Sequence, residues 1–120
     1  MVISTAPAEQ TMQIFSAQDT ALDSIRFSPC FALMIPWQSN LPSWHAATVN
    51  DSSLEWLCFN QHKPGRTHQP SLIAHSSGAW AAEHFDTNLE EAKNTLLRDL
   101  NELLDLGNAE NASIHRWRYA

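Results

Sequence analysis

The side chains best suited to bind a ligand are concentrated in the last six residues of the chain. If this segment is a strand, successive side chains point to opposite sides, so His115, Trp117 and Tyr119 share one face. The same alternation places Arg116 and Arg118 on the other face. We interpret the three rings as candidate substrate contacts and the two guanidinium groups as candidate contacts for an anion or a cofactor.

A second pair of cations lies at a tight turn, where residues 63–66 are Lys-Pro-Gly-Arg. Proline presets the second position of a type II turn and glycine accepts the positive φ of the third, so this segment predicts the tip of a hairpin. Lys63 and Arg66 at its two ends are candidate contacts for a phosphate or carboxylate of a ligand or cofactor. The alternative is that they only keep the hairpin tip soluble.

The five tryptophans are a further source of aromatic surface. Trp37 and Trp44 lie in the segment 36–46, whose two prolines and lack of a clean period predict a loop. Loop positions make these two rings candidate substrate contacts. Core packing is the simpler explanation for Trp56 and Trp80.

The histidines and serines predict neither a metal site nor a hydrolase. None of the six histidines takes part in an HxxxH or HExxH pattern, so we expect no metal. His75, at the end of a predicted strand, is a candidate substrate contact. Ser76 and Ser77 follow it in the position of a nucleophile. Because Ala74 replaces the first glycine of GxSxG, capping of the next helix explains these serines better than a catalytic elbow does.

Composition excludes several classes of partner. A net charge of −6 argues against nucleic acid or an anionic membrane as a partner. The three glycines, Gly65, Gly78 and Gly107, are far apart, so a glycine-rich phosphate loop is absent and we expect no stable binding of FAD to this chain alone. No secretory signal or apolar run of about 20 residues is present, which predicts a cytoplasmic protein. Cys30 and Cys58 form no CxxC pattern and are expected to be reduced.

Local patterns predict a single domain, residues 1–120, of the α+β class. We expect an antiparallel β-sheet covered by two or three helices, because strands predominate and the helices are grouped instead of alternating with them. The predicted strands are 1–4, 24–35 in two pieces around Pro29, 47–49, 54–60, 71–75 and 113–119. The predicted helices are 7–18, 77–85 and one that begins at a capping box of Thr87 and Glu90 and stops near Gly107. Apolar residues on both sides of 54–60 predict a strand covered on both faces.

Three segments in this order resemble renalase and the bacterial renalase-like FAD-dependent oxidoreductases of the flavin amine oxidase superfamily: Asn-Gln-His-Lys-Pro-Gly-Arg at 60–66, Ala-His-Ser-Ser-Gly-Ala-Trp-Ala-Ala-Glu-His at 74–84, and His-Arg-Trp-Arg-Tyr-Ala at 115–120. Residues 2–10 and 29–34 are also similar to that family. The resemblance implies the antiparallel-sheet substrate domain of an enzyme that oxidises amines or dihydronicotinamide isomers with FAD.

The resemblance covers the substrate domain without the glycine-rich FAD-binding domain, so we expect a partial domain that is not catalytic alone. The implied partners are a small-molecule substrate and a separate FAD-binding polypeptide. Unpaired sheet edges also predict self-association. The alternative is a stand-alone α+β module that binds a small ligand without catalysis.

Overall fold

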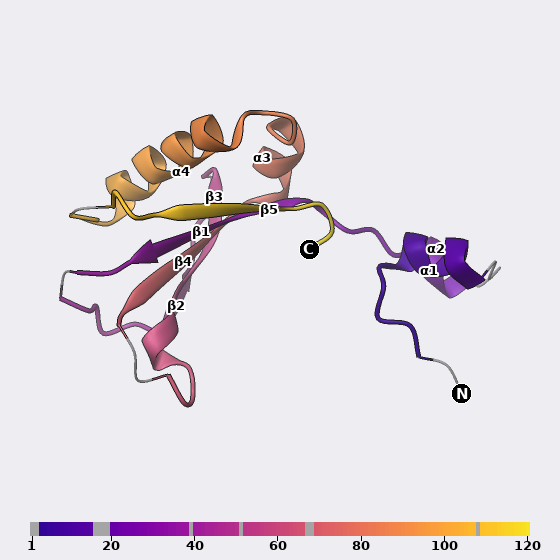
Figure 1. Ribbon diagram of the computed structural model, residues 1–120, viewed down its shortest axis with the longest axis horizontal. Coiled ribbons are helices and arrows are strands. Elements are labelled where there is room, and N and C mark those ends of the chain that lie inside the picture. Colours follow the sequence, from indigo (N-terminus) through magenta and orange to yellow (C-terminus); the bar gives the residue numbers. More distant parts are fainter. Residues whose placement is uncertain (1–2, 16–19, 39, 51, 67–68, 108) are drawn as a thin grey trace.

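The computed structural model describes residues 3–15, 20–38, 40–50, 52–66, 69–107 and 109–120. Five strands form one sheet in the order β2-β3-β4-β1-β5, and every neighbouring pair is antiparallel. Figure 1 shows this single layer, with β4 at its centre. The strands are β1 (Cys30–Pro36), β2 (Ala46–Thr48), β3 (Leu54–Phe59), β4 (Ser71–Ser76) and β5 (Ser113–Trp117).

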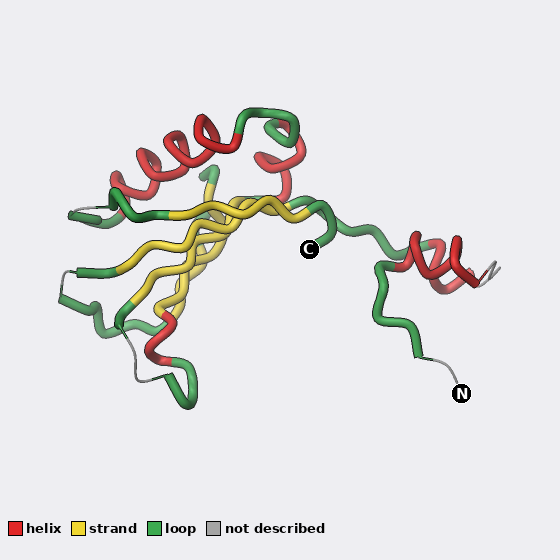
Figure 2. The backbone as a smooth tube through the Cα atoms, viewed as in Figure 1, coloured by secondary structure: helices red, strands yellow, loops and turns green. Residues whose placement is uncertain are grey.

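Two helices cover one face of the sheet. They are α3 (Gly78–Glu83) and the longer α4 (Leu89–Leu103), which lie on the same side in Figures 1 and 2. The short helices α1 (Ala8–Phe15) and α2 (Thr20–Asp23) pack on each other away from the sheet. The predicted α+β class is therefore confirmed, with two helices on the sheet.

The N-terminal helices α1 and α2, which we call the arm, make the molecule elongated. Its radius of gyration is 17.0 Å, whereas a compact chain of this length would have about 14 Å. Residues 24–29, which were predicted to be extended, form the link between this arm and β1 and contain no strand. Ile14 is 66% exposed and Phe15 is 49% exposed, so the arm carries apolar surface to solvent.

The core lies between the helices and the covered face of the sheet. In β1 the alternate residues Phe31, Leu33 and Ile35 are fully buried. They pack in one cluster with Leu96 and Leu100, which lie one helical turn apart on α4. The helical spacing of leucines in the sequence thus corresponds to the face that contacts the sheet.

The β3–β4 hairpin agrees with its predicted turn. The Arg66 amide donates to the Lys63 carbonyl at 3.2 Å, and Gly65 has φ +74°. Before the turn, a single 3-10 turn, η1, runs over Asn60–His62. Helices cover only the face of β3 that carries Leu57. On the other face Cys58 is also buried and Trp56 is half-buried, so the predicted coverage of both faces is met at the end of β3 near Cys58.

Three further element boundaries differ from the predictions. The cap of α4 is Asn88, whose side chain accepts from the Glu90 amide at 2.9 Å, so the predicted capping box at Thr87 is wrong. This helix ends at Leu103, before Gly107. At the N-terminus, Ile3 and Ser4 form no strand, whereas Met1, Val2 and the predicted helix end at Gln18 lie outside the described residues.

None of the helices in the described part of the chain combines the length and the apolar character needed to cross a bilayer.

Candidate functional site

The face of the sheet opposite the helices is open and carries a row of ring side chains. Pairing aligns one residue from each strand across this face, and three of the five residues have aromatic or imidazole rings. The row is Thr48, Trp56, His75, Ala32 and His115, in the order β2 to β5. We call this surface the open face.

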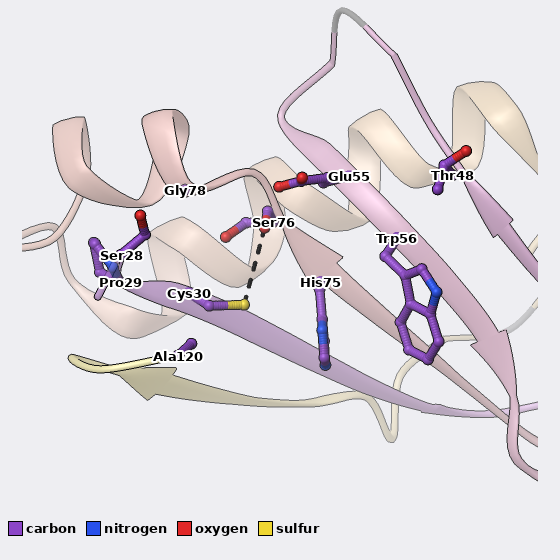
Figure 3. A pocket seen from close by; sticks show the side chains of 10 residues that line it. All are labelled: Ser28, Pro29, Cys30, Thr48, Glu55, Trp56, His75, Ser76, Gly78 and Ala120. Atoms are coloured by element: carbon purple, nitrogen blue, oxygen red, sulfur yellow. Dashed lines mark hydrogen bonds between the residues drawn. The ribbon is translucent and has the colours of Figure 1, made fainter. Parts of the chain in front are cut away.

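A hollow of about 450 Å³ lies at one end of the open face (Figure 3). Its volume is in the range of small-molecule sites. Cys30 from β1, His75 from β4 and Trp56 from β3 line it side by side, and Glu55 lines its rim. Because these residues come from three neighbouring strands of a rigid sheet, their relative positions are fixed by the ladder.

A β-bulge brings Glu55 to this hollow. Leu54 pairs with Ser76 and Trp56 pairs with His75, so Glu55 is an extra residue in β3. Its carbonyl accepts from the Val49 amide at 2.9 Å, which keeps the neighbouring segment in place. Bulges re-aim side chains and are frequent beside binding sites. Here the result is a carboxylate and an indole from consecutive residues lining one hollow.

His75 is a half-buried imidazole packed against an indole. Its ring centroid lies 5.1 Å from that of Trp56, with an angle of 42° between the planes. Burial lowers the pKa of His75, and the charge of Lys63 lowers it further. The imidazole is therefore neutral at pH 7, when one ring nitrogen donates a hydrogen bond and the other accepts one.

Cys30 contributes a thiol, not a thiolate. Burial raises the pKa of Cys30, as does the nearby charge of Glu55, while hydrogen bonding with Ser76 opposes the change. The thiol donates weakly to the Phe31 carbonyl at 3.4 Å and to the Ser76 carbonyl at 3.9 Å. A protonated, hydrogen-bonded thiol is a poor nucleophile, so we assign Cys30 to the wall of the hollow.

The terminal strand follows the predicted alternation. His115 and Trp117 are exposed on the open face, with ring centroids 4.3 Å apart, and Trp117 pairs with Cys30 across the ladder. Tyr119 lies beyond the end of β5 and packs edge-on against Phe27 at 6.1 Å. Three of the six predicted substrate contacts, His75, His115 and Trp117, therefore share the open face.

The predicted anion contacts of β5 lie on the covered side. Arg116 donates to the carbonyls of Phe85 and Thr87, and its guanidinium lies 5.1 Å from the centroid of the Phe85 ring. Arg118 is 4.5 Å from the same ring. These contacts join β5 to the loop between α3 and α4. That either arginine contacts an anion stays a prediction. Such an anion would lie on the side of the sheet opposite the hollow.

Trp37 and Trp44 belong with the core. Both rings pack against Phe59, at 4.9 and 4.8 Å between centroids, and Trp37 is only 8% exposed. Trp37 borders a separate shallow hollow beside Leu104 at the end of α4. The loop does not bring these two tryptophans to the open face, because β1 continues far enough for the Trp37 amide to donate to the Pro70 carbonyl at 2.8 Å.

Lys63 and Arg66 are exposed at the tip of the β3–β4 hairpin, apart from the hollow. The neighbouring η1 turn stacks the ring of His62 on that of His45, with centroids 4.0 Å apart. Lys63 influences the hollow through its charge, which acts on His75. Contact of these two cations with an anion stays a prediction.

The two serines after β4 have structural partners. The Ser76 hydroxyl, 3% exposed, accepts from the Phe31 amide at 2.9 Å, and the Ser77 hydroxyl accepts from the Trp80 amide at 3.3 Å. Ser77 is thus the predicted cap of α3. No group of three or more His, Cys, Asp or Glu side chains suited to a metal ion occurs among the residues that the structure describes.

Sequence reasoning missed Glu55 and assigned Trp56 to the core. Strict alternation from Leu57 and Phe59 places Glu55 on the covered face, where a lone carboxylate would be costly to bury. That conflict is the signal for a bulge, which shifts the carboxylate to the rim of the hollow.

No family model matches the sequence. Among solved structures, the chain is similar to the PF1083 protein from Pyrococcus furiosus, with a TM-score of 0.49 and 14% sequence identity. The match covers 89% of this chain and 28% of that protein, so the chain spans little more than a quarter of the length of the protein it matches.

Proposed function

We propose that this chain is the substrate-binding part of a renalase-like FAD-dependent oxidoreductase and acts together with a separate FAD-binding polypeptide. The observation that carries the proposal is the open face, a rigid aromatic surface without a covering layer in the described part of the chain. Support also comes from the ordered sequence resemblance, two of whose three main segments contribute His75 and the terminal strand to this face.

The chain alone does not fit a complete flavin site. Rings on the open face suit contact with a flat conjugated molecule. The pyrophosphate of FAD needs a cluster of backbone amides, usually in a glycine-rich loop, and the three glycines here are far apart. We therefore assign the flavin and the redox step to the partner.

The role of this chain is then to bind and orient a small substrate. The rings of Trp56 and His75 hold it by contact, and the neutral imidazole fixes its polar groups. Covering the open face would exclude water from the reacting groups, which strengthens every polar contact made there. The parent activity is oxidation of amines or of dihydronicotinamide isomers.

Pairing with another polypeptide is supported by exposed apolar surface. Trp117 is 51% exposed and Met34 is 40% exposed on the open face, and Ile14 and Phe15 are exposed on the arm. A partner polypeptide that covers these side chains would remove their apolar surface from water. Without the partner we expect the chain to self-associate, which light scattering measures. A monodisperse monomer over a wide concentration range contradicts this part of the proposal.

Coexpression tests the pairing directly. The tagged chain is produced together with the FAD-binding part of a renalase-like enzyme, and the visible flavin absorption of the purified complex is recorded. We expect a yellow complex that an added amine or dihydronicotinamide reduces. Replacing both His115 and Trp117 by Ala should weaken this reduction, whereas Arg98→Ala, an exposed change on α4, should not. If no flavin copurifies, the proposed pairing is wrong.

A second function, a stand-alone module for a small ligand, is favoured by one observation. The hollow is shaped by residues from several elements, namely β1, β2, β3, β4, the start of α3 and the adjacent loops, and has a volume of about 450 Å³. A module of this kind would bind its ligand with full affinity without a partner. Tight binding by the isolated chain that the FAD-binding polypeptide leaves unchanged would favour the module over the oxidoreductase part.

A further inference from the structure

The sheet has two edge strands, and β5 is the less protected of them. The other edge, β2, has only three residues, and a strand that short offers few groups for pairing. β5, yellow in Figure 1, has five residues, all aligned with β1 without a register shift, and it contains neither proline nor lysine. Among the described strands, none pairs with its outer side. Alternate backbone N–H and C=O groups of β5 are therefore open to another strand.

The same edge is locally basic in an acidic chain. The net charge of the whole chain is −6, whereas residues 113–118 contain two arginines and no acidic residue. The guanidinium groups of Arg116 and Arg118 lie 5.1 and 4.5 Å from the centroid of the Phe85 ring. Both charges are thus gathered at one ring on the covered side of β5. Neither guanidinium forms an ion pair with another residue that the structure describes.

The two sides of β5 specify what a pairing strand must carry. On the open face, His115 and Trp117 present exposed rings, which pair well with β-branched side chains across a ladder. On the covered side, a residue directly opposite Arg116 would have its Cβ atom about 5 Å away, and Arg118 lies two residues further along. Carboxylates at these cross-strand positions are favourable and lysines are unfavourable. The matching strand therefore alternates acidic and β-branched residues.

We propose that the outer edge of β5 pairs with an extended acidic segment of another polypeptide, whose carboxylates face Arg116 and Arg118. A second copy of this chain fits the edge less well, because antiparallel pairing of two β5 strands brings the arginines of both copies to one junction. The inference goes beyond the proposed function, since strand addition needs no flavin in the partner.

Three peptides of one pattern test the preference for acidic residues. The first is Ac-Thr-Glu-Val-Glu-Val-Glu-Thr-NH2, and the other two have Gln or Lys in place of every Glu. Binding to the full chain is followed by NMR of its backbone amides at low salt. We expect the Glu peptide to bind about five- to tenfold more tightly than the Gln peptide, because two cross-strand ion pairs form, and the Lys peptide to bind most weakly.

Hydrogen exchange locates the peptide on the edge. In the free chain, the amides of β5 that are not bonded to β1 should exchange fast, whereas those bonded to β1 should be protected. The Glu peptide should slow the exchange of the first set only, which gives an alternating pattern over residues 113–117. A Glu peptide with proline in place of both valines cannot form a regular ladder and should bind far more weakly.

Two matched variants assign the preference to the basic edge. Arg118→Gln removes an exposed charge beside the proposed strand and should weaken binding of the Glu peptide about two- to threefold, with little effect on the Gln peptide. Arg98→Gln makes the same change on α4 and should alter neither affinity. Arg116 is kept in both variants, because its hydrogen bonds hold β5 to the loop between α3 and α4.

Three results would overturn the inference. They are binding of the Lys peptide as tight as that of the Glu peptide, no protection of β5 amides by the Glu peptide at millimolar concentration, and protection of the same amides by the chain itself as its concentration rises. The last result would show that a second copy occupies the edge. Since the peptides carry no flavin, failure here leaves the pairing with an FAD-binding polypeptide standing, and failure of that pairing leaves strand addition standing.

Discussion

We expect Arg116 to contribute more to stability than Arg98, Arg118 or the exposed cations Lys63 and Arg66. Its half-buried guanidinium donates to the carbonyls of Phe85 and Thr87 and lies near the rings of Phe31 and Phe85. These contacts fasten β5 to the loop that joins α3 and α4. Arg116→Ala removes all of them and leaves two carbonyl groups without their donor.

The size of the effect follows from the hydrogen bonds and ring contacts of this guanidinium. One hydrogen bond from a charged donor contributes about 1.5–3 kcal/mol, and the longer one to Thr87, at 3.3 Å, adds less. The ring contacts add about 0.5–1 kcal/mol. Because the guanidinium is partly solvated, we expect a total loss of about 2–3 kcal/mol in the free energy of unfolding. With a urea slope of about 1.5 kcal/mol per molar, the midpoint falls by about 1.3–2 M.

Urea unfolding followed by circular dichroism measures this shift. Arg98→Ala is the control, because the side chain of Arg98 is 69% exposed and pairs only with its neighbour Asp99 in the described structure, so its loss should cost less than about 1 kcal/mol. Arg116→Lys keeps the charge without the planar fork and should lie between the two. If Arg116→Ala shifts the midpoint no more than Arg98→Ala does, the contacts of Arg116 with the loop between α3 and α4 do not stabilise the protein as expected.

Three further outcomes concern single positions. The pKa of His75 should lie below that of a free imidazole and rise in Lys63→Gln, as followed by NMR. Since the native state favours the neutral ring, the stabilisation linked to His75 is complete above about pH 6.5 and declines as the pH falls below that value; a native pKa above that of a free imidazole contradicts the assignment. Iodoacetamide should alkylate native Cys30 more slowly than a free thiol at pH 8, and Glu55→Gln should accelerate the reaction; equal rates would show that the thiol is not perturbed. Gly65→Ala should destabilise the hairpin by about 1 kcal/mol in thermal melts, because φ is +74°, and an unchanged melting temperature argues against that turn.

Features that depend on local spacing were predictable from the sequence. The alternation of β5 places His115 and Trp117 on one face and Arg116 on the other, as two-residue periodicity requires. The spacing of Leu96 and Leu100 identifies the buried side of α4. The turn at Pro64 and Gly65 was also specified locally. In each case the residue types within a few positions decide the conformation.

Features that depend on non-local pairing were not predictable. β1 lies between β4 and β5, which follow it by about 40 and 80 residues, and no local pattern encodes that order. Trp37 is buried because the continuation of β1 packs it on Phe59, a contact invisible to loop composition. The bulge at Glu55 arises from the register between β3 and β4. The hollow depends on the strand order and on the bulge. For this reason His75 was the only residue of its lining that the sequence identified as a site residue.

The distribution of exposure over the open face indicates how a partner and a small ligand would share this surface. The large exposed side chains, Met34 on β1 and Trp117 on the edge strand β5, do not line the hollow, whose lining includes Trp56 and His75. A polypeptide that covers Met34 and Trp117 would therefore bind beside a small ligand without displacing it. Because Trp117 pairs with Cys30, this partner would also border the hollow and reduce its access to water. Ligand and partner should consequently strengthen each other's binding by the same factor, since coupling between two sites is reciprocal.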